Sequence, residues 1–184
     1  MIAATELAFR LHEGQVRKET GVPYVSHLLA VAATVLEAGG DEDQVVAALL
    51  HDAPEDQGGR RTLTEIRRRF GARVATIVDA GTDTYESPKP PWRPRKEAWL
   101  ARLDREIPDD ALVVIGADKL HNARSIVSAL HERGVAALDR FNGGRAGTLW
   151  YYRRAADTLA SRAPGPLAGE LCRTVEEMER VAGR

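Results

Sequence analysis

Residues 25–51, VSHLLAVAATVLEAGGDEDQVVAALLH, carry the clearest pattern in the chain and decide the fold class. Gly39 and Gly40 are typical of a helix C-terminus, and Asp41 stands where an N-cap would open the next helix. Helical spacing of this kind predicts two helices that fold back on each other as an antiparallel hairpin. The apolar side chains that recur at this spacing are Leu28, Val31, Ala32, Val35, Leu36, Val45, Ala48 and Leu49.

Helical spacing continues through most of the chain, and sustained alternation of apolar and polar residues is missing. We therefore expect an all-α fold, a bundle of about nine or ten helices. Thr62 and Glu65 have the spacing of a capping box. Segments 13–24 and 84–94, rich in glycine and proline, are expected to be irregular. The expected helices are 2–13, 25–38, 43–51, 63–70, 72–82, 94–105, 111–130, 135–140, 147–161 and 167–181.

Length and composition narrow the class of protein. The 184 residues favour one domain, 1–184, with core motifs in 5–126 and C-terminal helices 135–181 packed on them. The 26 basic and 27 acidic residues give a net charge of −1, which argues against nucleic-acid or membrane partners. The single Cys172 excludes an internal disulfide, and no export signal or membrane anchor is expected. A cytoplasmic location is predicted, while the oligomeric state stays open.

A metal site is predicted where the hairpin brings two histidines together. His51 and Asp52 end an apolar helical run, and adjacent helical residues can both reach one ion between them. His27 lies 13 residues before Gly40 and His51 lies 11 after it. At a rise of about 1.5 Å per residue, antiparallel packing puts the two imidazoles within about 3 Å of register.

Asp118 is the expected fourth ligand. It follows the apolar run 111–117, where an unpaired carboxylate would be costly to bury. Two imidazoles and two carboxylates without a thiolate favour Mn²⁺, with Fe²⁺ and Zn²⁺ as alternatives. His12 and His121 are expected to orient or pack rather than to bind the metal.

Glu55 and Asp56 are the candidate acid–base groups. They come just after Asp52. Pro54, which lies between Asp52 and Glu55, is expected to stop the regular helix. Their carboxylates could then face a hydrolytic water rather than the metal.

Cations for a phosphorylated substrate are expected from both irregular segments. Arg17 and Lys18 lie in the first, next to the helix that carries His27. In and after the second, basic residues stand against one nearby anion, Glu86, a local excess of +3 that would attract a polyphosphate. The arginines of 60–73 are interpreted as a solvated helix face. The four cations of the second group are Lys89, Arg93, Arg95 and Lys96.

Several motifs, in order, resemble the HD-domain hydrolases of the RelA/SpoT type, which include small alarmone hydrolases and metazoan SpoT homologues. The resemblance covers roughly residues 5–126. It rests on His12 with Gly14, Gln15, Arg17 and Lys18; Gly21, Pro23, Tyr24 and His27; residues 47–52 with Glu55 and Asp56; Phe70 and Gly71; and residues 117–122 with Arg124.

The resemblance implies a substrate that composition and spacing do not. It implies removal of the 3′ pyrophosphate of (p)ppGpp, giving GDP or GTP and pyrophosphate, with Mn²⁺ at His27, His51, Asp52 and Asp118. It also implies that Arg17, Lys18 and Asn122 hold substrate. Downstream, Tyr151 is the best match to a substrate-binding tyrosine of the family.

Two alternatives remain. Residues 89–100 also resemble a segment of bacterial HD proteins whose substrate is undetermined, so the substrate could be another nucleotide, such as an adenine alarmone or a phosphorylated dinucleotide. The second alternative is a regulatory module that binds nucleotide without turning it over. Glu55 and Asp56 argue against it, because a pure binder needs no water-activating carboxylates.

Overall fold

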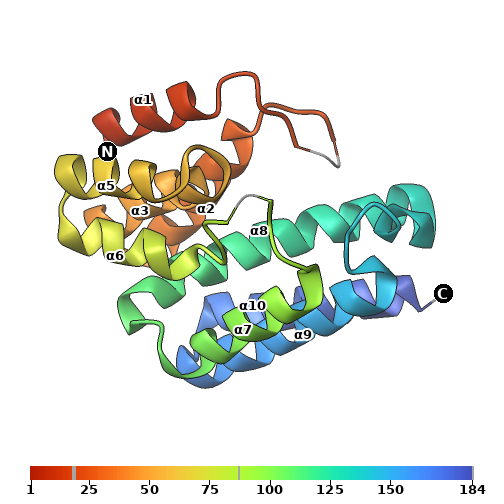
Figure 1. Ribbon diagram of the computed structural model, residues 1–184. Coiled ribbons are helices and arrows are strands. Elements are labelled where there is room, and N and C mark those ends of the chain that lie inside the picture. The colour runs from red at the N-terminus through yellow and green to blue at the C-terminus, as the bar shows by residue number, and fades with distance from the viewer. Residues whose placement is uncertain (18–19, 87, 184) are drawn as a thin grey trace.

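The computed structural model describes residues 1–17, 20–86 and 88–183. Figure 1 shows these residues as a layered set of helices, and the expected all-α class is confirmed. The elements are α1 (Ile2–Leu11), α2 (Val25–Glu37), α3 (Glu42–Leu50), α4 (Ala53–Asp56), α5 (Gly59–Phe70), α6 (Ala72–Gly81), α7 (Trp92–Arg105), α8 (Asp109–Arg133), the 3₁₀ helix η1 (Gly134–Leu138), α9 (Gly144–Arg162) and α10 (Pro166–Ala182).

The hairpin of α2 and α3 forms as predicted. Gly39 turns the chain with a φ of 82°, a conformation that glycine adopts without a steric penalty. Asp41 and Gln44 then form a capping box, each side chain accepting a hydrogen bond from the other residue's backbone N–H. The rings of His27 and His51 lie 5.2 Å apart between centroids, which confirms the expected register.

The prediction was wrong for the segment after Asp52. Pro54 does not stop the helix but lies in the first turn of α4, where its missing N–H costs no hydrogen bond. α5 begins at Gly59 rather than at residue 63. Thr62 therefore does not cap this helix with Glu65; its hydroxyl donates a hydrogen bond to the carbonyl of Gln57.

α8 connects the two halves of the bundle (Figure 1). It packs against α2, α3 and α6 on one side and against α9 and α10 on the other. Residues 112–115, which are β-branched in part, are helical as expected. Leu120, Ile126 and Leu130 are buried in this core. Asp118 is therefore held on a rigid element that faces the hairpin.

The two irregular segments are close to the predicted ones. Residues 12–24 contain an isolated antiparallel bridge between Val16 and Pro23. The second segment is shorter than predicted, because α7 begins at Trp92 rather than at residue 94. The indole of Trp92 fills a space that a side chain at Gly143 would need, since a Cβ there would lie 2.6 Å from Cη2 of Trp92. This contact fixes the start of α7 against the start of α9.

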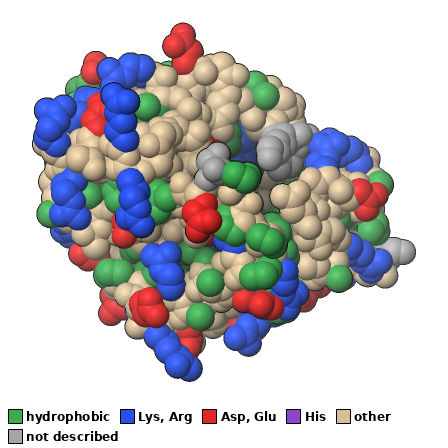
Figure 2. Space-filling view, viewed as in Figure 1, with side chains coloured by type: hydrophobic (Ala, Val, Ile, Leu, Met, Phe, Trp, Pro, Cys, Tyr) green, Lys and Arg blue, Asp and Glu red, His purple; other side chains and the backbone are tan. Residues whose placement is uncertain are grey.

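The surface mixes charges of both signs. Figure 2 shows Lys and Arg side chains interspersed with Asp and Glu where Figure 1 places α5 and α6. Arg73 pairs with Asp41 and Asp110 at 2.8 and 2.9 Å, while Arg67 and Arg68 are exposed. The described part of α5 thus has the solvated basic face that was predicted. Among the described helices, none combines the length and the hydropathy that a membrane span requires.

Candidate metal centre

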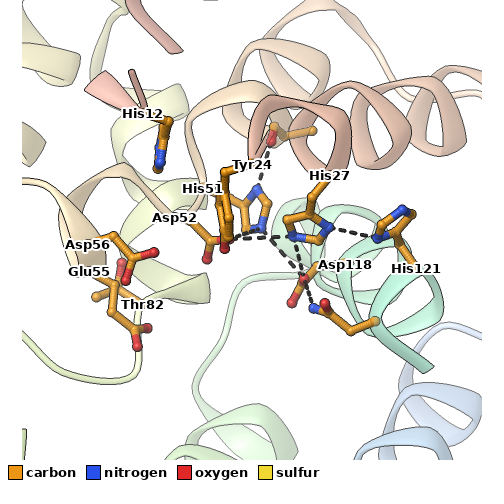
Figure 3. A network of polar contacts seen from close by, with 12 residues as sticks. His12, Tyr24, His27, His51, Asp52, Glu55, Asp56, Thr82, Asp118 and His121 are labelled. Atoms are coloured by element: carbon orange, nitrogen blue, oxygen red, sulfur yellow. Dashed lines mark hydrogen bonds and ion pairs between the residues drawn. The ribbon is translucent and has the colours of Figure 1, made fainter. Parts of the chain in front are cut away.

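Two histidines and two aspartates meet between α2, α3 and α8 (Figure 3). Nε2 of His51 lies 3.0 Å from Oδ2 of Asp52 and 3.5 Å from Oδ1 of Asp118. Nε2 of His27 lies 3.4 and 3.2 Å from the same two oxygens. One ligand atom each from His27, His51 and Asp118 lie within 4.8 Å of one another, an arrangement that could hold a metal ion. The structure brings the four predicted ligands together.

The histidine nitrogens that face this centre are free to bind an ion. Nδ1 of His51 lies 2.8 Å from the carbonyl oxygen of Ala48, which fixes the proton on Nδ1 and leaves Nε2 as the ligand atom. Nε2 of His27 and Nε2 of His51 are both buried, and neither has a hydrogen-bond partner among the described residues. Buried polar atoms are normally satisfied, so these side chains fit a bound cation.

His121 orients His27 from behind. Its Nδ1 lies 2.8 Å from Nδ1 of His27, so one of the two nitrogens must donate a hydrogen. Burial, together with nearby His27 and Arg17, lowers the pKa of His121 to about 4. A neutral His121 can accept the proton of His27 Nδ1, which leaves Nε2 of His27 directed at the centre.

Replacing His121 should weaken metal binding without removing a ligand. We expect His121→Ala to lower the affinity for Mn²⁺ by about 10-fold, the effect typical of losing an outer hydrogen bond to a ligating histidine. Calorimetric titration with Mn²⁺ measures this affinity. His131→Ala is the matched control, because His131 is an exposed histidine on the same helix that pairs with Glu177. Equal affinities in all three proteins would contradict the prediction.

Both aspartates of the centre are ionised. The hydroxyl of Tyr24 donates a 2.6 Å hydrogen bond to Oδ2 of Asp52. Lys119 donates one of the same length to Oδ2 of Asp118. Burial raises the pKa of each carboxyl, but the charge that His51 carries when it is protonated, as without a metal, outweighs it at Asp52, and the charge of Lys119 outweighs it at Asp118. The pKa of both therefore lies well below the usual range.

Glu55 and Asp56 lie on α4 beside the centre (Figure 3). Glu55 lines a small cavity of about 40 Å³ together with Asp52 and Asp118. Burial and the charge of Asp83 raise its pKa, although Lys89 opposes the shift. Asp56 accepts a 3.0 Å hydrogen bond from Nε2 of Gln15. A carboxyl with a raised pKa next to a metal centre is suited to proton transfer.

The positive charge predicted around residues 86–96 is largely paired with carboxylates from outside this stretch. Nζ of Lys89 lies 2.7 Å from Oε1 of Glu55, and Nε of Arg93 lies 2.7 Å from Oε1 of Glu97. Arg95 and Lys96 both pair with Asp83. All three carboxylates lie outside residues 86–96, and Asp83 is shared by two cations, so most of the positive charge of this stretch is offset within the fold.

The remaining substrate-binding candidates differ in their hydrogen-bond partners and burial. Nη2 of Arg17 donates a 2.8 Å hydrogen bond to Oδ1 of Asn122, whose amide nitrogen in turn donates to Asp118. Tyr151 is buried, and its hydroxyl has no hydrogen-bond partner among the described residues. Lys18 lies outside the described residues.

A larger cavity opens beside the metal centre. Its volume is about 340 Å³, and it shares Glu55, Lys96, Lys119 and Tyr151 with the smaller cavity. Lys89, Arg95 and Asn122 line it too, whereas Arg93 and Arg17 do not. The cavity therefore collects most of the predicted substrate contacts, with Arg93 stacked outside it, 3.4 Å above the ring centroid of Trp150.

Sequence reasoning assigned no role to Gln15, Tyr24 or Asp83. Gln15 and Tyr24 were part of the resemblance, but their hydrogen bonds to Asp56 and Asp52 were not foreseen. Asp83 could have been identified from the sequence, because it closely follows the apolar helix α6, just as Asp118 follows the apolar residues 111–117.

Comparison with known proteins agrees with this geometry. A family model described as an HD domain matches residues 4–140, which is most of the chain. The chain belongs to the HD-domain family. This result confirms the resemblance noted from the motifs.

The HD domain is similar to named hydrolases. It is 37% identical over 129 residues to the human guanosine-3′,5′-bis(diphosphate) 3′-pyrophosphohydrolase MESH1, covering 68% of this chain and 69% of that protein. It is 38% identical over 122 residues to a Haemophilus influenzae enzyme of the same activity, covering 64% of this chain and 17% of that longer protein. A solved structure described as a metazoan ortholog of SpoT shares the fold, with a TM-score of 0.73, 24% identity, and coverage of 97% of this chain and 93% of that one.

Proposed function

We propose that this HD domain is a metal-dependent phosphohydrolase that removes the 3′ pyrophosphate of (p)ppGpp, giving GDP or GTP and pyrophosphate. The observation that carries the proposal is the pair of buried Nε2 atoms of His27 and His51, which have no hydrogen-bond partner in the described part of the chain and face the carboxylates of Asp52 and Asp118. The similarity to MESH1, which is named for this reaction, supports the choice of substrate.

The chemistry requires water to replace the ribose oxygen on phosphorus. A divalent ion at His27, His51, Asp52 and Asp118 would lower the pKa of a water from about 16 toward about 7 and neutralise charge on the phosphate. The bond between O3′ and its phosphorus breaks as the water oxygen bonds to that phosphorus. Glu55 would take the proton of the water on a carboxylate oxygen. The same proton, passed on by protonated Glu55 or exchanged through solvent, would protonate O3′ as it leaves as a hydroxyl, so the step balances.

Substrate binding is assigned to the cavity beside the centre. Lys89, Arg95 and Lys96 would hold phosphate oxygens, with Tyr151 lining the same wall. Asn122 on α8 and its hydrogen-bond partner Arg17 would contact the substrate from the α8 side of the cavity. Arg93 and Lys18 are retained as further contacts on sequence grounds alone.

Finer features belong to the same proposal. We assign Mn²⁺ as the metal, with Fe²⁺ or Zn²⁺ as substitutes, because nitrogen and carboxylate ligands suit all three. The whole chain, 1–184, would act as one hydrolase domain. A nucleotide is the expected small-molecule partner, and the cytoplasm is the expected location.

Product analysis tests the proposal. The purified protein is incubated with Mn²⁺ and, separately, with ppGpp, pppGpp, ppApp and common nucleotides, and the products are separated by anion-exchange chromatography. We expect GDP from ppGpp and GTP from pppGpp, with one pyrophosphate released each time, because the bond at O3′ is the one broken. Addition of a chelator should abolish the reaction.

Other outcomes would replace the proposal. Release of orthophosphate would indicate a nucleotidase, and turnover of ppApp alone would indicate an adenine alarmone as substrate. Tight binding of ppGpp without products would favour the regulatory module.

A further inference from the structure

Asp83 joins the segment after α6 to two cations at the start of α7. Its side chain is only 3% exposed. Oδ1 accepts a 2.6 Å hydrogen bond from Nη1 of Arg95, and Oδ2 accepts one of 2.5 Å from Nζ of Lys96. Burial raises the pKa of Asp83, but the positive charges and hydrogen bonds of Lys96 and Arg95 outweigh it and lower that pKa, so the carboxylate is ionised. Asp83 thus forms a buried three-residue ion cluster.

The two cations of this cluster lie where phosphate is expected. Arg95 and Lys96 both line the 340 Å³ cavity, and Lys96 also lines the small cavity at the metal centre. Their side chains are 9% and 18% exposed, so they are held inside the wall and not extended into solvent. Nη1 of Arg95 lies 4.0 Å from Oε1 of Glu55. The cluster therefore lies beside Glu55, which lines the same cavity.

Asp83 contacts both cations at once. Arg and Lys have long, flexible side chains, and two buried positive charges repel each other. The carboxylate between them offsets that repulsion, and its hydrogen bonds hold both side chains. The backbone N–H of Asp83 also donates a hydrogen bond of 3.5 Å to Oε2 of Glu55, so the same residue contacts the proton-transfer group.

We propose that Asp83 is a positioning residue that fixes Arg95 and Lys96 on the wall of the larger cavity, so that they hold a pyrophosphate group beside Glu55. This inference rests on the proposed function for the nucleotide. The chemistry that the cluster recognises is the pyrophosphate itself.

A purely electrostatic role and a positioning role of Asp83 predict opposite effects on anion binding when Asp83 is neutralised. If Asp83 acted only through its charge, Asp83→Asn would leave more net positive charge beside the cavity and would tighten the binding of an anion. If it positions Arg95 and Lys96, the same substitution weakens binding because the two side chains lose their fixed geometry. Asp83→Glu keeps the charge but displaces the carboxylate by one methylene.

The experiment measures binding of inorganic pyrophosphate to the full chain by calorimetry, with no metal added. We expect Asp83→Asn to raise the Kd about 10-fold and Asp83→Glu about 3-fold, as for loss or distortion of charge-assisted hydrogen bonds. Glu179→Gln is the matched control, since it breaks an arginine–carboxylate pair with Arg153 outside the residues that line either cavity, and should not change the Kd. Circular dichroism melts check that each variant is folded.

Kinetics with ppGpp give a second readout that a purely structural role would not produce. We expect Asp83→Asn to raise KM about 10-fold while kcat falls by less than about 3-fold, because Glu55 and the metal ligands remain. Unchanged or tighter pyrophosphate binding in Asp83→Asn, an unchanged Kd in Asp83→Glu, or no binding by the unsubstituted protein would each overturn the inference. A protein that binds pyrophosphate in the expected order but does not hydrolyse ppGpp would overturn the proposed function alone.

Discussion

Asp52→Asn should remove metal and activity together. Oδ2 of Asp52 lies 3.0 Å from Nε2 of His51 and 3.4 Å from Nε2 of His27, and it belongs to an ionised carboxylate. Asparagine keeps the size and can still accept the hydrogen bond of Tyr24, but it is a neutral and much weaker ligand. Metal-dependent stabilisation of a phosphoryl transition state is worth several kcal/mol, so we expect turnover to fall by on the order of 10³-fold or more.

Metal content is the deciding measurement for this variant. Elemental analysis after dialysis should show a stoichiometric ion in the unsubstituted protein and almost none in Asp52→Asn. Asp157→Asn is a suitable control, because Asp157 is 59% exposed on α9, pairs with Arg153, and should keep the full metal content. If Asp52→Asn retained as much metal as the unsubstituted protein, Asp52 would not be a ligand.

The meeting of the four predicted ligands could be foreseen because it depends largely on local helical geometry. Helical spacing and the glycine turn place His27 and His51 at one level, and these are short-range properties of the chain. Asp118 could be added because a carboxylate after an apolar run needs a partner. The helical class could be predicted for the same reason. α4 was missed because proline in a first helical turn and proline that ends a helix have the same local sequence.

The electrostatics of the substrate side could not be foreseen from neighbouring residues. Counting charges along 86–96 gave an excess of cations, yet Lys89 pairs with Glu55, which lies 34 residues away. Arg95 and Lys96 likewise pair with Asp83, beyond the stretch that was counted. Such pairs depend on how the segment between α6 and α7 lies against α4 and the start of α7, which no periodicity of the sequence encodes. The charge of a binding wall is therefore a property of the tertiary fold.

Glu55→Gln should separate proton transfer from metal binding. Glutamine has the size of glutamate but cannot take a proton, and Glu55 is not among the four predicted ligands. Because burial and Asp83 raise the pKa of Glu55, it is a better proton acceptor than an exposed carboxylate. We expect kcat for ppGpp to fall by about 10² or more, with metal content unchanged and KM changed far less. In this variant Lys89 still has one carboxylate partner, since its Nζ lies 3.5 Å from Oδ1 of Asp56.

Two comparisons make the result for Glu55 specific. Glu97→Gln is the matched control, because Glu97 is an exposed glutamate on α7 that pairs with Arg93, and its turnover should be unchanged. Asp56→Asn shows how much the neighbouring carboxylate contributes, since Gln15 holds Asp56 in place by a hydrogen bond. Near-normal turnover in Glu55→Gln, combined with a large loss in Asp56→Asn, would transfer the proton-accepting role to Asp56. Loss of metal in Glu55→Gln would instead make Glu55 part of the metal centre.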